Sequence, residues 1–278
     1  MLNSFLIDCR ENELSERTIS KYKKDISDFL SFGNIKSKED ITKLVLLDYK
    51  EELKRIHTKG TEIKVASINN KIVIINKFLV YTFKSKEYNL KKMKEQINYN
   101  NKNLLTKEEY QRLLVWANNE NNDRLYFIMR VLAETGIRIS ELQCVTVESL
   151  SAGIRINNKG KYRIVTMPKK LKKDLLNYCK EYKIESGIIF KTKSGKPLDN
   201  AYIYKQMQAL TGKARGGLKK SKVHPHNFRH LFAFEYLKNG GNVLNLADIL
   251  GHSSIETTRL YTRADANSNN NILEKMYK

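Results

Sequence analysis

Three short segments, far apart in the chain, contain the side chains that cleavage of a phosphodiester without a metal ion requires. They are Arg138 in ETGIRISEL, His226 and Arg229 in HPHNFRH, and His252 and Tyr261 in LGHSSIETTRLY. Two arginines can clamp the non-bridging oxygens of a phosphate, a tyrosine can attack the phosphorus, and imidazoles can hydrogen-bond the phosphate or move protons. Each residue taken singly also fits an ordinary role, such as a surface ion pair, a loop histidine or a packed aromatic ring.

The tyrosine needs help to react, because a free phenol has a pKa near 10 and is a poor nucleophile at neutral pH. A cluster of cationic groups favours the anionic form of the phenol and neutralises the phosphate that it attacks. His226 and Arg229 are three residues apart, a spacing that places both side chains on one face of a helix. The sequence therefore predicts that these segments meet in one cationic pocket.

A metal site is the alternative reading of the same histidines. His224, His226 and His230 form H-x-H-x₃-H, and the last two have the i, i+4 spacing of zinc ligands. No carboxylate or cysteine stands at ligand spacing beside them, and Arg229 would place a positive charge next to the ion. We expect no metal and no other cofactor, since the chain has neither a P-loop nor a cluster of acidic residues for Mg²⁺.

Two basic segments surround these motifs. The stretch GIRINNKGKYRIVTM alternates on both sides of Asn158–Lys161, which predicts a β-hairpin with lysines at its tip. The loop KKSKVHPH precedes His226, and we take Lys219, Lys220 and Lys222 in it as candidate DNA contacts.

The elements that must position these residues are mostly helices. Residues 1–86 show helical apolar stripes throughout and no convincing strand pattern, residues 87–103 resemble a solvated linker, and 104–278 form a second domain that ends in the tail 264–278. Thr106 and Glu109 are spaced as a capping box, and Gly136 and Gly251 are placed to end helices. The apolar positions of the tail predict a short amphipathic segment that packs on a neighbouring protomer or on its own domain.

Composition favours a nucleic-acid partner. The 278 residues include 51 Lys and Arg against 30 Asp and Glu, a formal net charge of +21. A surface of this kind suits a polyanion, because each neutralised phosphate releases condensed counterions. No apolar run is long enough to span a membrane, and Cys9, Cys144 and Cys179 form no pair with disulfide or zinc spacing, so we expect a cytoplasmic protein with free thiols.

Taken together, the motifs resemble those of the tyrosine recombinases, the family of phage and conjugative-transposon integrases and Xer proteins. The resemblance rests on T-G-x-R-x-S-E-L at 135–142, H-x-x-R-H at 226–230, L-G-H at 250–252 and a tyrosine nine residues after that histidine. It implies that Arg138 and Arg229 hold the scissile phosphate, that His226 and His252 donate hydrogen bonds to it, and that Tyr261 is the nucleophile.

The resemblance also implies a reaction and a fold. Members of the family form a 3′-phosphotyrosyl bond, and a lysine on a hairpin turn protonates the departing 5′ oxygen; Lys159 stands at that place, with Lys161 as its rival. We expect a mainly α-helical fold with a small antiparallel sheet, a core-binding domain and a catalytic domain, and four protomers on two duplex DNA sites.

The implied activity is site-specific recombination, which integrates or excises a mobile element or resolves or inverts DNA. Three alternatives stay open from the sequence. They are a catalytically idle DNA-binding protein of the same fold, the metal-dependent nuclease, and a relaxing or hairpin-forming enzyme with related chemistry.

Overall fold

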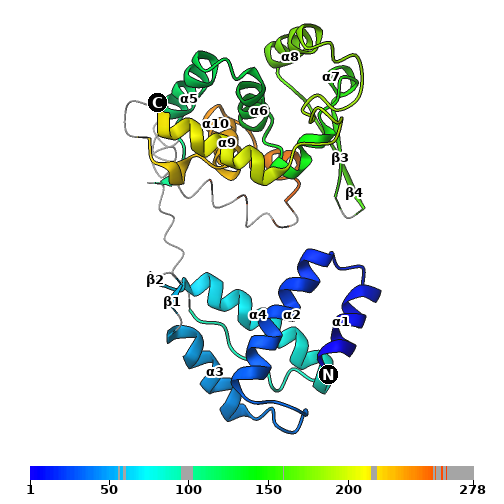
Figure 1. The fold of residues 1–278 in the computed structure, drawn as a ribbon, viewed down its shortest axis with the longest axis vertical. Helices are drawn as coiled ribbons and strands as arrows, with labels where there is room; N and C mark the ends of the chain where they lie inside the picture. Colours follow the sequence, from blue (N-terminus) through cyan, green and yellow to red (C-terminus); the bar gives the residue numbers. More distant parts are fainter. Residues whose placement is uncertain are drawn as a thin grey trace, which may run out of the picture. The chain divides into compact units, whose positions relative to one another are not determined.

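The chain divides into two compact units, Met1–Asn98 and Tyr99–Lys278, each of which is described by itself (Figure 1). The computed structural model describes residues 1–55, 57–58, 61–94, 103–158, 160–213 and 218–252, together with residues 254, 258 and 261. Lys159 and the tail 264–278, for which the sequence analysis made predictions, lie outside the described residues.

The first unit is built from helices whose apolar stripes face one another. Its elements are α1 (Leu2–Glu11), α2 (Glu16–Phe32), α3 (Lys43–Arg55), β1 (His57–Thr58), β2 (Thr61–Glu62) and α4 (Val65–Phe83). Phe29 and Phe78 are fully buried at its centre, and the Oγ of Ser15 caps α2 by accepting a hydrogen bond from the backbone of Thr18. The antiparallel pair β1–β2 was not predicted, because strands of two residues are too short to show an alternating pattern.

The first part of the expected linker is not solvated. Leu90 is buried against the core of the first unit, and its backbone N–H and C=O are both hydrogen-bonded by the side-chain amide of Asn76 on α4. Asn69 binds the backbone of Met93 in the same way. Sequence periodicity cannot reveal this docking, because the partners that hold the segment are 14 and 24 residues away in the chain.

The second unit is mainly helical with one β-hairpin, which confirms the predicted fold class. Its elements are α5 (Lys107–Asn119), α6 (Asp123–Thr135), the 3₁₀ helix η2 (Ile139–Cys144), α7 (Ser149–Ala152), β3 (Ile154–Asn158), β4 (Lys161–Val165), α8 (Lys169–Glu181), α9 (Asn200–Lys213), the 3₁₀ helix η3 (Lys220–Lys222), α10 (Pro225–Lys238) and α11 (Val243–Leu250). Thr106 and Glu109 form the capping box of α5.

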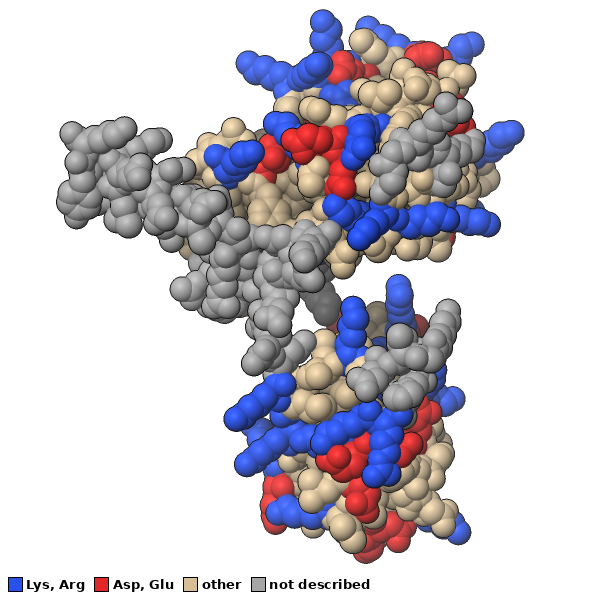
Figure 2. Space-filling model, turned by 90° about the vertical axis from the view of Figure 1, so that its left-hand side faces the viewer, with Lys and Arg blue, Asp and Glu red and all other residues tan. Residues whose placement is uncertain are grey.

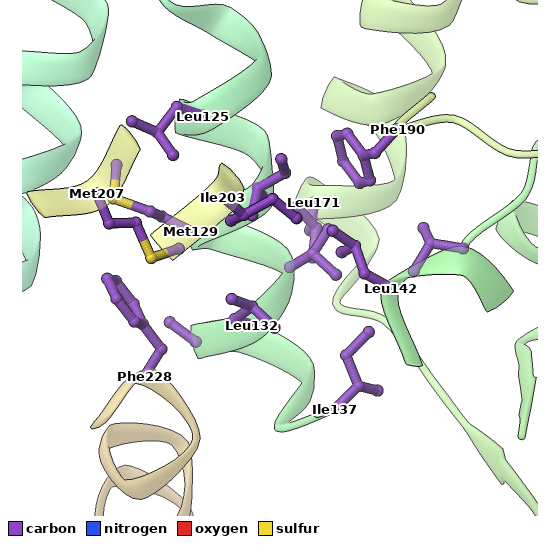
Figure 3. Packing of buried hydrophobic residues seen from close by; sticks show 14 of the residues in the cluster. Leu125, Met129, Leu132, Ile137, Leu142, Leu171, Phe190, Ile203, Met207 and Phe228 are labelled. Carbon is purple, nitrogen blue, oxygen red and sulfur yellow. The ribbon is translucent and has the colours of Figure 1, made fainter. Parts of the chain in front are cut away.

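Helices α6 and α10 pack against each other, and α10 carries Arg229, one of the buried residues of the site. Figure 3 shows Met129 and Leu132 of α6 near Phe228 of α10 and Met207 of α9, all in one apolar core. Phe228 is fully buried, so α10 cannot rotate without removing this ring from the core. The packing therefore fixes the direction in which the next residue, Arg229, points.

The hairpin forms in the predicted register. Ile154 pairs with Val165 and Asn158 pairs with Lys161, and Gly160 in the turn has a φ of +78°. The side chains alternate as expected of a half-buried sheet, with Ile154 buried and Tyr162 79% exposed.

Candidate active site

Arg138 begins the segment that follows the C-terminus of α6. Gly136 ends α6 in the left-handed conformation, with a φ of +68°, and any Cβ at this position would collide with the ring of Phe232 on α10. Two residues later Arg138 caps η2, where Glu141 accepts hydrogen bonds from its backbone N–H at 2.8 Å and from its Nη1 at 3.1 Å. The guanidinium keeps partial exposure, since 29% of the Arg138 side chain is accessible to solvent.

Arg229 is almost completely buried, with 4% of the residue exposed. Its Nη1 donates to the carbonyl oxygen of Gly136 at 2.7 Å, and its Nη2 donates to that of Leu250 at 2.5 Å. Burial and the nearby charge of Arg138 lower the pKa of Arg229 to about 10, so the guanidinium stays protonated at neutral pH. A buried cation is costly, and the hydrogen-bond partners of Arg229 among the described residues are backbone carbonyl groups.

The C-terminal end of α11 collects arginines from three different parts of the second unit. A helix leaves its last carbonyl groups without intrahelical partners and carries partial negative charge at this end. Three consecutive carbonyl oxygens each accept a hydrogen bond from a different guanidinium. They are Ile249 O from Arg163 Nε at 3.0 Å, Leu250 O from Arg229 Nη2 at 2.5 Å and Gly251 O from Arg138 Nη2 at 3.3 Å.

Glu141 completes this arrangement and was not predicted to take part. It is 7% exposed, and its carboxylate accepts from Arg163 Nη2 at 2.7 Å as well as from Arg138. Burial alone would raise the pKa of Glu141, but the hydrogen bonds from the Arg138 backbone and from Arg163 outweigh it and keep the pKa below its usual value. We call Arg138, Glu141, Arg163 and Arg229 the arginine clamp.

The sequence held a signal for one of the two missed residues. Glu141 lies in the ISEL segment three residues after Arg138, the spacing of the N-cap and N3 positions of a capping box. Arg163 showed no such signal, because it stands between the apolar residues Tyr162 and Ile164, whose side chains are exposed while Arg163 is half-buried.

His226 lies in the first turn of α10, exposed to solvent and one turn from Arg229. Loss of solvent on the protein side of its ring lowers the pKa of His226, and the charges of Arg229 and Arg138 lower it further. His226 and Arg229 are three residues apart on α10, so the imidazole and that guanidinium lie on the same face of the helix.

His252 follows the left-handed Gly251, whose φ is +60°, at the end of α11. Its Nδ1 lies 2.8 Å from the Oγ1 of Thr258. Burial, and then the charges of Arg229 and Arg138, lower the pKa of His252 to about 4. The ring is therefore neutral at pH 7 and can present one N–H to a ligand.

Tyr261 reaches the same region from the segment after α11. It is 4% exposed, its ring packs edge-on against Phe234 at a centroid distance of 5.4 Å, and its hydroxyl lies 2.8 Å from the Nδ1 of His230. This contact holds the phenol beside α10 at the residue that follows Arg229. The structure thus brings five of the predicted residues to one place within one protomer. They are Arg138, His226, Arg229, His252 and Tyr261.

The lysines predicted to act in catalysis or DNA binding differ in their exposure and contacts. Lys159 is not described, and Lys161 starts β4. Lys219 and Lys220 are exposed, as expected of DNA contacts, whereas the Nζ of Lys222 is bound to Glu109 at 2.7 Å and ties the loop to α5. On the face seen in Figure 2, Lys and Arg side chains project from both units, with Asp and Glu side chains among them.

The metal alternative does not fit the site. Within the described ranges, no three histidine, cysteine or carboxylate side chains gather closely enough to hold a metal ion. The structure describes all three histidines of the H-x-H-x₃-H pattern, and the Nδ1 of His230 faces Tyr261.

No helix among the described residues is long and apolar enough to cross a membrane.

Two arginines, two imidazoles and a tyrosine in one unit are the side chains that cleavage of a phosphodiester through a tyrosine requires. The chain belongs to the phage integrase family, whose sequence profile matches residues 103–268. It is a tyrosine recombinase, an enzyme that transfers DNA strands in site-specific recombination, as the motifs predicted.

Individual relatives are similar over different lengths. A tyrosine recombinase of Pseudothermotoga lettingae is 30% identical over 260 residues, which are 89% of this chain and 87% of that protein. Tyrosine recombinase XerH of Campylobacter jejuni is 33% identical over 172 residues, 58% of this chain and 48% of that protein. The Tn1549 transposon integrase, solved in complex with transposon right end DNA, has the same fold, with a TM-score of 0.76 at 18% identity over 100% of this chain and 99% of that one.

Proposed function

We propose that this recombinase cleaves one strand of duplex DNA by attack of Tyr261 on a phosphate held in the arginine clamp, which leaves a 3′-phosphotyrosyl bond and a free 5′-hydroxyl. The observation that carries the proposal is the position of the phenol. Its hydroxyl is bound to α10 one residue from Arg229, inside the same protomer that supplies both guanidinium groups.

The groups divide the work as their chemistry allows. Arg138 and Arg229 bind the non-bridging oxygens and stabilise the charge that develops as the phosphorus becomes five-coordinate. Arg138 keeps an accessible guanidinium for this contact. His226 and His252 donate hydrogen bonds to the same phosphate, and the neutral state of His252 at pH 7 leaves it a single N–H to offer.

Breakage of the bond to the 5′ oxygen needs a proton donor, and we assign this role to Lys159 at the hairpin turn, with Lys161 as the alternative. The ester formed with Tyr261 stores the energy of the phosphodiester, so religation needs neither ATP nor a metal ion. Attack by a 5′-hydroxyl from a second DNA then completes strand exchange.

Duplex DNA is the partner that the charge supports, given the net charge of +21 and the exposed Lys219 and Lys220. We propose a complex of four protomers on two DNA sites in the cytoplasm, with the tail 264–278 packed on a neighbouring protomer. The biological outcome is the movement of a mobile element, the resolution of DNA multimers or inversion.

Covalent trapping tests the nucleophile. Nicked duplexes selected for binding from a random-sequence library release a short fragment on cleavage, so that religation is prevented and the protein–DNA ester accumulates. We expect an adduct from the natural chain in EDTA and none from Tyr261→Phe. Tyr182→Phe, which removes an exposed hydroxyl bound to Asp123 on another face, is the matched control and should form the adduct normally. An adduct from Tyr261→Phe, or cleavage that EDTA abolishes, would contradict the proposal.

A further inference from the structure

The imidazole that contacts the proposed nucleophile is His230, to which the reaction described above gives no role. Its Nδ1 lies 2.8 Å from the hydroxyl oxygen of Tyr261, and the two rings are 5.4 Å apart between centroids. A phenol can donate or accept a hydrogen bond, and in the tautomer of His230 whose proton is on Nε2 it is Nδ1 that accepts the phenolic proton. His226, one turn earlier on α10, has its ring centroid 6.5 Å from that of His230.

The surroundings keep His230 neutral and therefore able to accept. Burial, and to a smaller extent the nearby positive charge, together lower the pKa of His230 to about 4. The titratable and charged groups that face it come from its own helix and from the segment after α11. Within the described ranges they are His224 at the N-cap of α10, His226 and Arg229 on α10, and His252 and Tyr261 beyond α11.

Solvent has little access to the phenolic proton. Tyr261 is 4% exposed, and Phe234 packs edge-on against its ring, so the hydroxyl is directed into the protein at His230. Loss of this proton to a fixed side chain is therefore more direct than loss to bulk water. An anionic phosphate bound to Arg229 would oppose the positive charge that weakens the imidazole as a base, so its basicity rises when DNA is in place.

We propose that His230 is a further catalytic residue, the base that accepts the phenolic proton when Tyr261 attacks. The inference rests on the proposed function of Tyr261. As the bond between the phenolic oxygen and phosphorus forms, the phenolic proton moves to the lone pair on Nδ1 of His230. The bond between phosphorus and the 5′ oxygen breaks, and that oxygen takes a proton from the lysine. In religation the 5′-hydroxyl returns its proton to the neutral lysine as its oxygen attacks the phosphorus, the bond between phosphorus and the phenolic oxygen breaks, and that oxygen takes back the proton that His230 has kept.

The test compares single-turnover cleavage rates of the natural chain and His230→Asn over a range of pH, with the selected nicked duplexes. The amide oxygen of asparagine replaces Nδ1 as a hydrogen-bond acceptor but cannot take up a proton. We expect the variant to cleave roughly 10²-fold more slowly at pH 7, the scale of one general base. Its deficit should shrink as the pH approaches about 10, where the phenol ionises unaided.

Two measurements separate this role from a purely structural one. Phe234→Leu loosens the tyrosine ring but leaves the imidazole, so any loss of rate should be the same at every pH. Incorporation of a fluorinated, more acidic tyrosine at position 261 should restore much of the rate of His230→Asn. Duplex binding by gel shift confirms that each variant is folded.

The possible results are distinct. Wild-type cleavage by His230→Asn, a deficit independent of pH, or no rescue by the fluorinated tyrosine would each overturn the inference while leaving Tyr261 as nucleophile. An adduct that survives in Tyr261→Phe would instead overturn the proposed function itself.

Discussion

The two sides of the active site are held together in different ways. The arginine clamp is anchored on main-chain carbonyls, namely Gly136 O and three consecutive carbonyls at the end of α11. On the nucleophile side, defined as His230, His252, Thr258 and Tyr261, the described contacts pair an imidazole with a hydroxyl, at 2.8 Å in both cases.

This difference predicts which substitutions each side of the active site tolerates. A carbonyl acceptor is present whatever the side chain, so the clamp depends on helix ends and glycines that put the carbonyls in place. The nucleophile side depends on the chemical identity of single side chains. Substitutions should therefore damage the clamp through stability and catalysis together, and the nucleophile side mainly through its chemistry and pH dependence.

The largest effect is expected from Arg229→Lys. The planar guanidinium of Arg229 reaches both Gly136 O and Leu250 O, whereas a lysine ammonium cannot reach both. One buried carbonyl oxygen therefore loses its hydrogen-bond donor, which lowers the free energy of unfolding by about 1–3 kcal/mol. Cleavage should fall by roughly 10²- to 10³-fold because one transition-state donor is lost. Urea unfolding and single-turnover cleavage measure the two losses.

Arg138→Lys is the comparison for that variant. Its side chain is 29% exposed, so it should lose cleavage to a similar extent with a smaller loss of stability. If both variants lost the same free energy of unfolding, the burial of Arg229 would not be the cause of the larger loss expected for Arg229→Lys.

Gly251→Ala should have the next largest effect, a loss of free energy of unfolding. The residue has a φ of +60°, and an added Cβ would lie 2.7 Å from Nη1 of Arg163, so both strain and crowding disturb the clamp. We expect a loss of about 2–4 kcal/mol. Gly195→Ala, at a φ of +80° with nothing within 4 Å of its Cβ, should lose only about 1–2 kcal/mol. Thermal unfolding of the pair checks this, and equal losses would rule out crowding against Arg163.

Glu141→Gln should weaken the clamp by removing its one carboxylate, at a cost of about 1.5–3 kcal/mol at pH 7. The folded state lowers the pKa of Glu141, so its contribution is present above the unfolded pKa of about 4.3 and is lost as the pH falls through the folded value. The gap in unfolding free energy between the natural chain and the variant should narrow in acid. A gap that stays constant from pH 7 to acid would contradict the assigned ion pairs.

The smallest effect concerns the nucleophile side. The folded pKa of His252 is about 4, below the unfolded value of about 6.5, so the unfolded chain binds more protons between these values and stability falls with falling pH. His252→Gln should reduce the fall between pH 7 and 5 by on the order of 1 kcal/mol. Part of the dependence of stability on pH remains in that variant, because the pKa of His230 is also about 4 in the folded chain. An unchanged slope in denaturant unfolding would mean that His252 is not held neutral.

Local signals in the sequence predicted the elements that position the site. The capping box at Thr106, the helix-ending Gly136 and Gly251, and the hairpin around Gly160 are each set by neighbours a few residues away. The motif spacing likewise selected the arginines and the tyrosine, because each motif is short.

The supports of the site could not be predicted in the same way, since they join distant segments. Arg163 reaches Ile249 across 86 positions, and His230 reaches Tyr261 across 31. Lys222 looked like a free DNA contact in its basic loop, but Glu109, 113 positions away, pairs with it. Residue type and spacing report what a side chain can do, while its partner is decided by the packing of α6, α10 and α11.

Peptide mapping of the trapped adduct is the most direct test that the clamp and the phenol form one cleavage site. The adduct formed with a nicked duplex is digested with protease and nuclease and analysed by mass spectrometry. We expect a peptide in which Tyr261 carries a 3′-linked nucleotide phosphate, formed roughly 10²- to 10³-fold more slowly when Arg229 is replaced by lysine. A nucleotide on another residue, or attached through its 5′ end, would contradict this expectation.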